Sequence, residues 1–299
     1  MPVKLLLTLL LMLPLYAPSA SFAEQAVLFQ PVVSVYTDGE GHGLLQPEGV
    51  ACTENTLVIA DTGNNRLLQY TVKVDAVEFA SQIKMPQLTN PIRVQINSQG
   101  EIFALDGKNR RIVRLNKDGQ FAGNLDLKGV PPDTGATIVP RSFKIDQQDN
   151  IYVLDIFSGR VIVLNPRGDY LRQIAFPKKS GFFSDLTVDH GGSVYLIDSA
   201  NSMVYSAAKE AAEFLPLSKN MQEYISFPTC ITTDNRGVLY VTDQNGGSII
   251  LLGLDGSFRS RKAGMGWNEG LLNYPAAMCI TGTNAFIADR NNNRVQVFR

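Results

Sequence analysis

One segment of this chain occurs twice with few changes, at residues 59–70 and again at 287–298. In both copies a short apolar run ends at an aspartate, an Asn-rich turn follows, and an arginine begins a second apolar run. Weaker copies lie between them. Six copies align on one aspartate with spacings of 43 to 49 residues: Asp61, Asp106, Asp155, Asp198, Asp243 and Asp289. A period in this range is typical of propeller blades, each a small unit that buries its apolar faces against its neighbours.

Each copy except the last contains signals for four strands. The run before the aspartate, such as residues 151–154, lacks polar/apolar alternation, so both of its faces should be buried. The strand before it usually begins at a proline, whose missing N–H breaks no ladder bond at that position. A third strand follows the aspartate, and an Asn/Asp-Gly turn leads to a more polar fourth strand. The sequence therefore predicts an all-β fold, a six-bladed β-propeller of four-stranded antiparallel blades.

The two ends of the repeat array predict how the ring closes. The last copy stops at Arg299, directly after its third strand, while residues 32–36 form a strand with no copy of their own. We expect this N-terminal strand to complete the last blade, because the pairing covers an otherwise open strand edge.

The N-terminus has the pattern of a secretory signal peptide. Lys4 precedes an apolar stretch at residues 5–15, and Ser21 and Ala23 form a small-x-small cleavage site. The apolar stretch is about half of the roughly 20 residues that a membrane span needs. We expect residues 1–23 to be removed and residues 24–299 to form one exported domain, periplasmic or extracellular, without a membrane span.

The three cysteines are Cys52, Cys230 and Cys279. Export permits disulfides, but an odd number leaves at least one thiol unpaired within the chain. All three lie in apolar, strand-like stretches, and their spacing matches no metal-binding pattern. The sequence favours three small buried side chains with free thiols.

The pattern Pro-x-Gly-Val, followed by Ala-Asp-x-x-Asn-x-Arg and an apolar strand, resembles the NHL repeat. The match is specific in the first unit, at Pro47 to Val50 and Ala60 to Arg66, and in the last, at Ala288 to Arg294, and it is weaker in the middle units. The resemblance implies a six-bladed propeller, and similar propellers serve as protein-binding platforms, RNA readers, lyases and lactonases. The arginines five residues after the aspartates are Arg66, Arg111, Arg160 and Arg294. Because they recur, we interpret the Asp and Arg series as structural, with Asp accepting N–H groups of the following turn and Arg binding a carboxylate.

A ligand site is expected where the innermost strands begin, at the mouth of the central channel. The residues one or two positions after each proline position should converge there: Glu48, Arg93, Arg141, Asp185, Thr229 and Ala276. The charged members either satisfy one another or leave Arg93 and Arg141 to hold a small polar or anionic ligand. Trp267 and Tyr224 lie in inter-blade loops, where they either anchor a partner or pack over the blades.

Enzyme interpretations have less support in the sequence. His42 and His190 are the two histidines, which excludes a site of several histidines, and no nucleophile motif is present. Glu48 and Asp185 are candidate ligands for Ca²⁺ as a cofactor, as in a gluconolactonase-like site. A net charge of −1 and the expected export disfavour nucleic acid. The sequence favours an exported, non-catalytic scaffold that binds a protein through its inter-blade loops, and the alternative is a calcium-dependent lactonase-like hydrolase.

Overall fold

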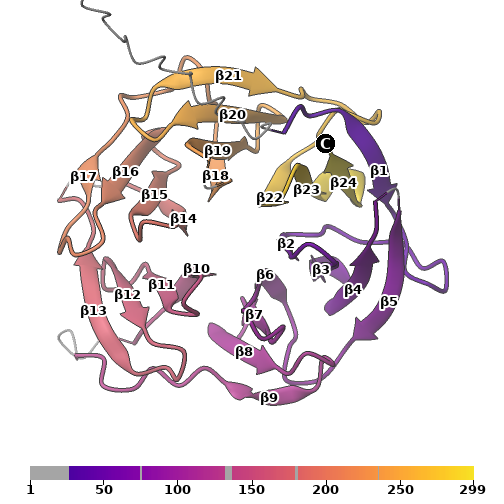
Figure 1. The fold of residues 1–299 in the computed structure, drawn as a ribbon, viewed down its shortest axis with the longest axis horizontal. Coiled ribbons are helices and arrows are strands. Elements are labelled where there is room, and N and C mark those ends of the chain that lie inside the picture. Colours follow the sequence, from indigo (N-terminus) through magenta and orange to yellow (C-terminus); the bar gives the residue numbers. More distant parts are fainter. Residues whose placement is uncertain (1–26, 75, 132–136, 179–180, 235) are drawn as a thin grey trace, which may run out of the picture.

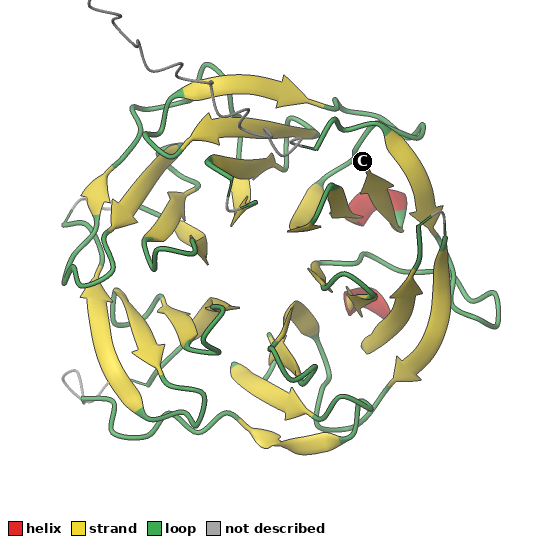
Figure 2. Ribbon diagram, in the orientation of Figure 1, coloured by secondary structure: helices red, strands yellow, loops and turns green. Residues whose placement is uncertain are grey.

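Six four-stranded antiparallel sheets stand around a central channel and form a six-bladed β-propeller, as predicted (Figure 1). This computed structural model describes residues 27–299 apart from 75, 132–136, 179–180 and 235. The expected signal peptide, residues 1–23, lies outside the described residues. Nearly all of the regular structure described is strand, and the short helical turns η1 (Thr62–Asn64) and η2 (Arg290–Asn292) lie among the sheets (Figure 2).

The first three blades follow the chain from the channel to the rim. Blade 1 consists of β2 (Gly49–Cys52), β3 (Thr56–Asp61), β4 (Arg66–Val72) and β5 (Val77–Ile83). Blade 2 consists of β6 (Pro91–Ile96), β7 (Ile102–Asp106), β8 (Arg111–Leu115) and β9 (Phe121–Asn124). Blade 3 consists of β10 (Pro140–Ile145), β11 (Ile151–Asp155), β12 (Arg160–Leu164) and β13 (Tyr170–Ala175).

The other three blades complete the ring. Blade 4 consists of β14 (Phe183–Val188), β15 (Val194–Asp198), β16 (Met203–Ala207) and β17 (Leu215–Pro216). Blade 5 consists of β18 (Pro228–Thr233), β19 (Val238–Asp243), β20 (Ser248–Gly253) and β21 (Phe258–Lys262). Blade 6 consists of β22 (Pro275–Thr281), β23 (Asn284–Asp289) and β24 (Arg294–Phe298), with β1 (Pro31–Val35) as its outermost strand.

The N-terminal strand closes the ring as predicted. β1 pairs antiparallel with β24, with Val35 opposite Val295 and Val33 opposite Val297. Strands from the two ends of the described chain therefore share one sheet, and β24 has no open edge.

The near-identical first and last copies form the same turn. η1 (Thr62–Asn64) and η2 (Arg290–Asn292) are single 3₁₀ turns, and each is followed by a left-handed asparagine. Asn65 has φ 54° and Asn293 has φ 52°. Asparagine tolerates this conformation because its short side chain can hydrogen-bond locally. The Asn-rich segment is thus required by backbone geometry.

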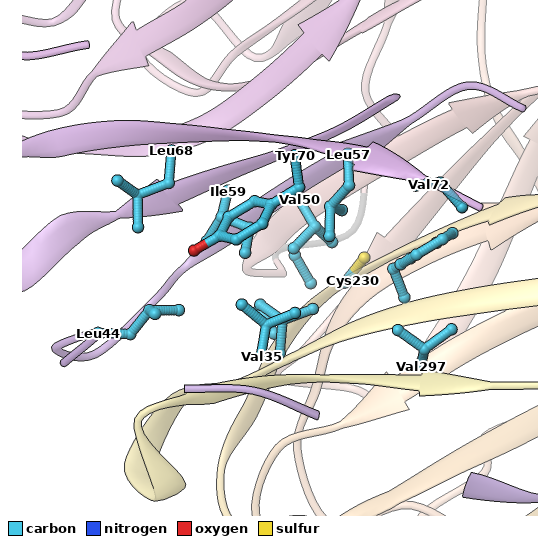
Figure 3. Packing of buried hydrophobic residues seen from close by; sticks show 14 residues of the cluster. Val35, Leu44, Val50, Leu57, Ile59, Leu68, Tyr70, Val72, Cys230 and Val297 are labelled. Carbon is cyan, nitrogen blue, oxygen red and sulfur yellow. The ribbon is translucent and has the colours of Figure 1, made fainter. Parts of the chain in front are cut away.

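The apolar core lies between blades. The second strands β7, β11 and β15 are buried along their whole length, as the missing alternation predicts. One cluster joins blades 6 and 1, where Val35 and Val297 pack toward Leu57 and Leu68 (Figure 3). The outermost strands β5, β9 and β21 are largely exposed. The sheets are therefore packed face to face around the channel.

The prediction of three free thiols is wrong. Cys52 of β2 and Cys279 of β22 form a disulfide between blades 1 and 6, while Cys230 remains a buried free thiol. The two Cα atoms are 6.0 Å apart although 227 residues separate them in sequence. The spacing of cysteines could not show this pair, because only closure of the ring makes β2 and β22 neighbours. Among the residues described, no helix combines the length and apolar content of a membrane span.

Candidate functional site

The loops between blades and the turns between the second and third strands share one face of the ring. The repeat aspartates hold these two sets of segments together. Each carboxylate accepts a backbone N–H from the inter-blade loop 16 or 17 residues before it, as in Leu45 to Asp61, Thr89 to Asp106, Val139 to Asp155, Phe182 to Asp198, Phe227 to Asp243 and Asn273 to Asp289. We call the surface formed by these loops and turns the loop face.

The repeat aspartates are therefore structural, but their shared partner differs from the one expected. The sequence predicts N–H donors from the following turn, and these occur in blades 2 to 5, for example from Asn109 to Asp106. The donor common to all six comes from the preceding loop. All six aspartates are at most 1% exposed, so none of them opens on the channel mouth.

The distance between each repeat arginine and its aspartate differs from blade to blade. The Nε–Oδ2 distance is 2.7 Å in both Arg66–Asp61 and Arg294–Asp289, 3.5 Å in Arg160–Asp155 and 3.8 Å in Arg111–Asp106. Met203 and Ser248 occupy the arginine position in blades 4 and 5 and pair with Asp198 and Asp243 in the strand register. The tightest pairs lie in blades 1 and 6, where the ring closes.

A β-bulge separates the expected channel residues into two layers. In blades 2 to 6 the register shifts between the first and third residues of the innermost strand, for example between Pro91 and Arg93. As a result, Arg93 in blade 2, Ser142 in blade 3 and Asp185 in blade 4 occupy equivalent strand positions. Arg141 is one position nearer the loop face. A bulge inserts one unpaired residue and re-aims the side chains around it. The sequence placed all six candidates in one set because it gives no sign of this insertion.

The layer of channel residues that contains Arg93 leaves almost no open space in the channel. Arg93, Ser142, Asp185 and Cys230 line a cavity of about 10 Å³, which has room for about one water molecule. Burial raises the pKa of the Cys230 thiol to about 12, and the nearby Asp185 contributes in the same direction. Beyond this constriction a second cavity of about 200 Å³ opens at the other end of the channel, lined by Lys144, Thr232 and both disulfide cysteines.

Asp185 belongs to the framework. It is 1% exposed and accepts a hydrogen bond from the Ser142 hydroxyl and another from the Ile231 N–H at 3.1 Å. These donors lie on the innermost strands of blades 3 and 5. Asp185 therefore connects three consecutive blades, and its two carboxylate oxygens are already engaged.

Glu48 and Arg93 have partners at the mouth. The Glu48 carboxylate accepts a hydrogen bond from Arg290 Nε at 3.1 Å. Arg93 donates from one terminal nitrogen to the carbonyl oxygens of Glu48 and Ile92, at 3.1 and 2.8 Å, but its buried Nε has no partner. Sequence reasoning missed Arg290, which follows the last repeat aspartate where blade 1 has Thr62.

Arg141 is the exception at the mouth. It is half-buried, its Nε is buried without a partner, and it makes no hydrogen bond or ion pair with another described residue. Its guanidinium carbon lies 5.4 Å from the centre of the Phe182 ring. Burial lowers the pKa of Arg141, and the positive charge of Arg93 lowers it further, while Glu48 and Asp185 oppose this. Arg141 is therefore within electrostatic reach of Arg93, Glu48 and Asp185, but it forms no hydrogen bond or ion pair with any of them.

The carboxylates at the mouth do not fit a calcium site. Ca²⁺ takes six to eight oxygen ligands, whereas Glu48 is bound to Arg290 and Asp185 is buried among donors. Within the part of the chain that the structure describes, no three His, Cys, Asp or Glu side chains gather closely enough to hold a metal ion.

The two aromatic candidates lie in different surroundings. Trp267 is 78% exposed in the loop between blades 5 and 6. The Tyr224 ring instead stacks on Phe258 of β21, with 4.3 Å between the ring centres. Tyr224 thus packs against the outer strand of blade 5, while Trp267 remains open to a partner.

Sequence reasoning missed other exposed apolar side chains on the loop face. Among the described residues of its loops and turns, the exposed large apolar ones are Leu45, Ile156, Phe157, Phe182, Met265, Trp267 and Tyr274. Ile156, Phe176, Pro177 and Phe183 line, with Phe182, a groove of about 490 Å³ at the seam of blades 3 and 4. A signal was present in the sequence, because Ile156 and Phe157 occupy a turn that is polar in blade 1.

Comparison with known proteins agrees with this architecture. No family model matches the sequence. Among curated proteins, Protein brain tumor of Drosophila melanogaster is 26% identical over 177 residues, which are 56% of this chain and 16% of that protein. The chain therefore spans about a sixth of the length of this relative. The similarity is a weak homology to an NHL-repeat protein, in line with the resemblance of the repeats.

Solved structures share the fold at low sequence identity. Virginiamycin B lyase from Staphylococcus aureus superposes with a TM-score of 0.64 at 14% identity, covering 89% of this chain and 98% of the lyase. A gluconolactonase from Xanthomonas campestris gives 0.63 at 14%, covering 90% and 95%. A protein of unknown function from Bacteroides thetaiotaomicron gives 0.66 at 15%, covering 88% and 71%. At these identities the likeness shows the propeller fold alone.

Proposed function

We propose that this chain is an exported, non-catalytic propeller that binds a protein partner through its loop face. The observation that carries the proposal is the set of exposed apolar side chains there. One group, with Phe157 and Phe182, lies at the seam of blades 3 and 4, and another, with Met265, Trp267 and Tyr274, precedes blade 6. Large exposed apolar groups on a rigid scaffold mark interaction surfaces.

Two further observations support parts of this proposal. The disulfide between Cys52 and Cys279 is of the kind that persists in oxidising compartments, which agrees with export. The engagement of Glu48 and Asp185 by other groups leaves the calcium-dependent hydrolase without a ligand set at the mouth. We therefore do not propose the hydrolase.

The test compares apolar residues on the loop face with apolar residues on the rim. We expect a variant with Phe157→Ser and Trp267→Ser to lose a partner that the wild-type chain retains from the exported protein fraction of its source. A central aromatic anchor contributes about 2 kcal/mol or more, so affinity should fall by roughly 30-fold or more even if only one of the two residues is such an anchor. Quantitative binding to the isolated partner measures the change.

The matched control carries Leu171→Ser and Leu215→Ser, on the outer strands β13 and β17, where the side chains are 51% and 61% exposed. This rim variant should bind like the wild-type chain. Equal loss of binding in both variants, or recovery of no specific protein by the wild-type chain, would contradict the proposal.

A further inference from the structure

The half-buried Arg141 guanidinium has five N–H donors, and no hydrogen bond from it to another described residue is present. Buried polar groups are normally hydrogen-bonded, and a charged group without a partner costs more than a neutral one. The contact with Phe182 stabilises the charge through the face of the ring but uses no N–H donor. This cost applies to the buried Nε, whereas the terminal nitrogens reach the surface, and their N–H donors are therefore available to a ligand.

The charges around Arg141 favour an anion. Arg93 lies close enough to disfavour the charged form of Arg141, and its own buried Nε is also without a partner. The nearby carboxylates do not fill these positions, because Glu48 is bound to Arg290 and Asp185 is bound to Ser142 and Ile231. An oxyanion between the two arginines would accept the unused hydrogen bonds and separate two like charges.

The space around the arginines limits what can reach them. Beside Arg93 the channel contains a cavity of only about 10 Å³. A ligand that enters from the loop face could therefore place no more than its end there. Beside Arg141, Phe182 forms one wall of the groove of about 490 Å³, whose other walls include Ile156, Phe176, Lys178 and Phe183. Neither arginine lines this groove, and Phe182 is the residue that both contacts Arg141 and lines the groove. Small-molecule sites are typically apolar with a few charged donors, and a ligand that lies over Phe182 would meet both.

We infer that Arg93 and Arg141 form a binding site for a carboxylate that is carried on an apolar body. The planar carboxylate matches the planar guanidinium fork, and the apolar body lies against Phe182 in the groove. A phosphate dianion is a poorer ligand, because it costs more to remove from water beside an apolar wall. This site lies beyond the proposed protein binding and does not depend on it.

The experiment is a calorimetric titration of the whole chain with 3-phenylpropionate, and with 3-phenylpropanol, acetate and inorganic phosphate as comparison probes. 3-Phenylpropionate should bind at least about tenfold more tightly than the neutral alcohol, acetate or phosphate, because only it supplies both features. Arg141→Gln should weaken the binding of 3-phenylpropionate by about tenfold or more. Arg93→Gln should have a smaller effect, because part of its guanidinium already binds carbonyl oxygens.

Arg114→Gln is the matched control. Its guanidinium also lies 5.4 Å from an aromatic ring, that of Phe103, but it faces Glu101 away from the mouth. This variant should bind the probe like the wild-type chain. Phe182→Ala, in an exposed loop, should weaken 3-phenylpropionate and leave acetate unchanged, so the test does not rest on one arginine. Absence of binding by the wild-type chain, equal binding by folded Arg141→Gln, or tighter binding of the alcohol or phosphate would overturn the inference.

Discussion

Arg66 and Arg111 occupy the same position in two blades but lie in different surroundings. Arg66 has a side chain that is 7% exposed and binds two carboxylates, those of Asp61 at 2.7 Å and Asp38 at 2.6 Å. Burial raises the pKa of the Asp38 carboxyl, but hydrogen bonds from Arg66, His42 and Glu40 outweigh it and hold that pKa well below its usual value of 3.8. Arg111 is 37% exposed and lies 3.8 Å from Asp106. One repeat position thus carries two interactions of different strength.

This contrast predicts unequal costs for one substitution. Arg66→Met should lower the free energy of unfolding by about 3 kcal/mol or more, because two buried carboxylates lose their cation. Arg111→Met should cost less than about 1 kcal/mol, because its pair is partly exposed. Urea denaturation of both variants at neutral pH measures the difference. Equal losses would show that the Asp–Arg pairs contribute alike in all blades.

At the scale of the element, β1 is the strand that closes the ring. Val35 is 6% exposed and packs into the cluster between blades 6 and 1, whereas Val32, at a register shift near the start of the strand, is 42% exposed. Tyr36, directly after the strand, accepts a hydrogen bond from Arg294 at 3.0 Å. One face of the strand therefore carries the packing, and the backbone covers the edge of β24.

We predict that Val35→Asp detaches β1 and that Val32→Asp does not. A charge at position 35 would be buried without a partner, which should cost about 3 kcal/mol or more. It should also expose the edge of β24 and promote association between chains. Denaturation and size-exclusion chromatography over a range of concentrations measure both effects. Val32→Asp, expected within about 0.5 kcal/mol of wild type, is the control on the same strand. Monomeric, stable Val35→Asp would argue against this role of β1.

At the scale of the molecule, the ring is closed twice at the seam between blades 6 and 1. The terminal strands pair at the rim, and the Cys52–Cys279 disulfide joins the innermost strands beside the channel. The covalent link closes a loop of 227 residues, so it restricts the unfolded chain strongly. The β1 pairing does not involve the disulfide, so we expect the fold to survive reduction with lower stability.

Replacement of Cys52 and Cys279 by serine should lower the free energy of unfolding by about 2 to 4 kcal/mol while the strand content is kept. Circular dichroism and urea denaturation measure this, and added reductant should destabilise only the wild-type chain. A thiol reagent should find no reactive thiol in the native chain and one after unfolding, because Cys230 is buried and its thiol pKa is raised to about 12. Unchanged stability on reduction would contradict this role of the disulfide.

The sequence by itself determined the number of blades, the order of strands in each, the pairing of residues 32–36 with the last blade and the framework role of the Asp and Arg series. These features follow from local signals, since turn residues, β-rich runs and their period act within one repeat of about 45 residues. Blade 4 has no proline at the start of its innermost strand, and Phe183 takes that position. It lies opposite Asp198, as Pro91 lies opposite Asp106 in blade 2.

Only the tertiary structure decided which channel residues meet. A one-residue bulge aligns Arg93 with Ser142 and Asp185 and leaves Arg141 nearer the loop face. Ring closure brings Arg290 to Glu48 across 242 residues and Cys52 to Cys279 across 227. These contacts join different blades, and their geometry depends on how whole sheets pack around the channel. No pattern within one repeat records that packing, so the unpartnered Arg141 beside Phe182 is visible only in the folded ring.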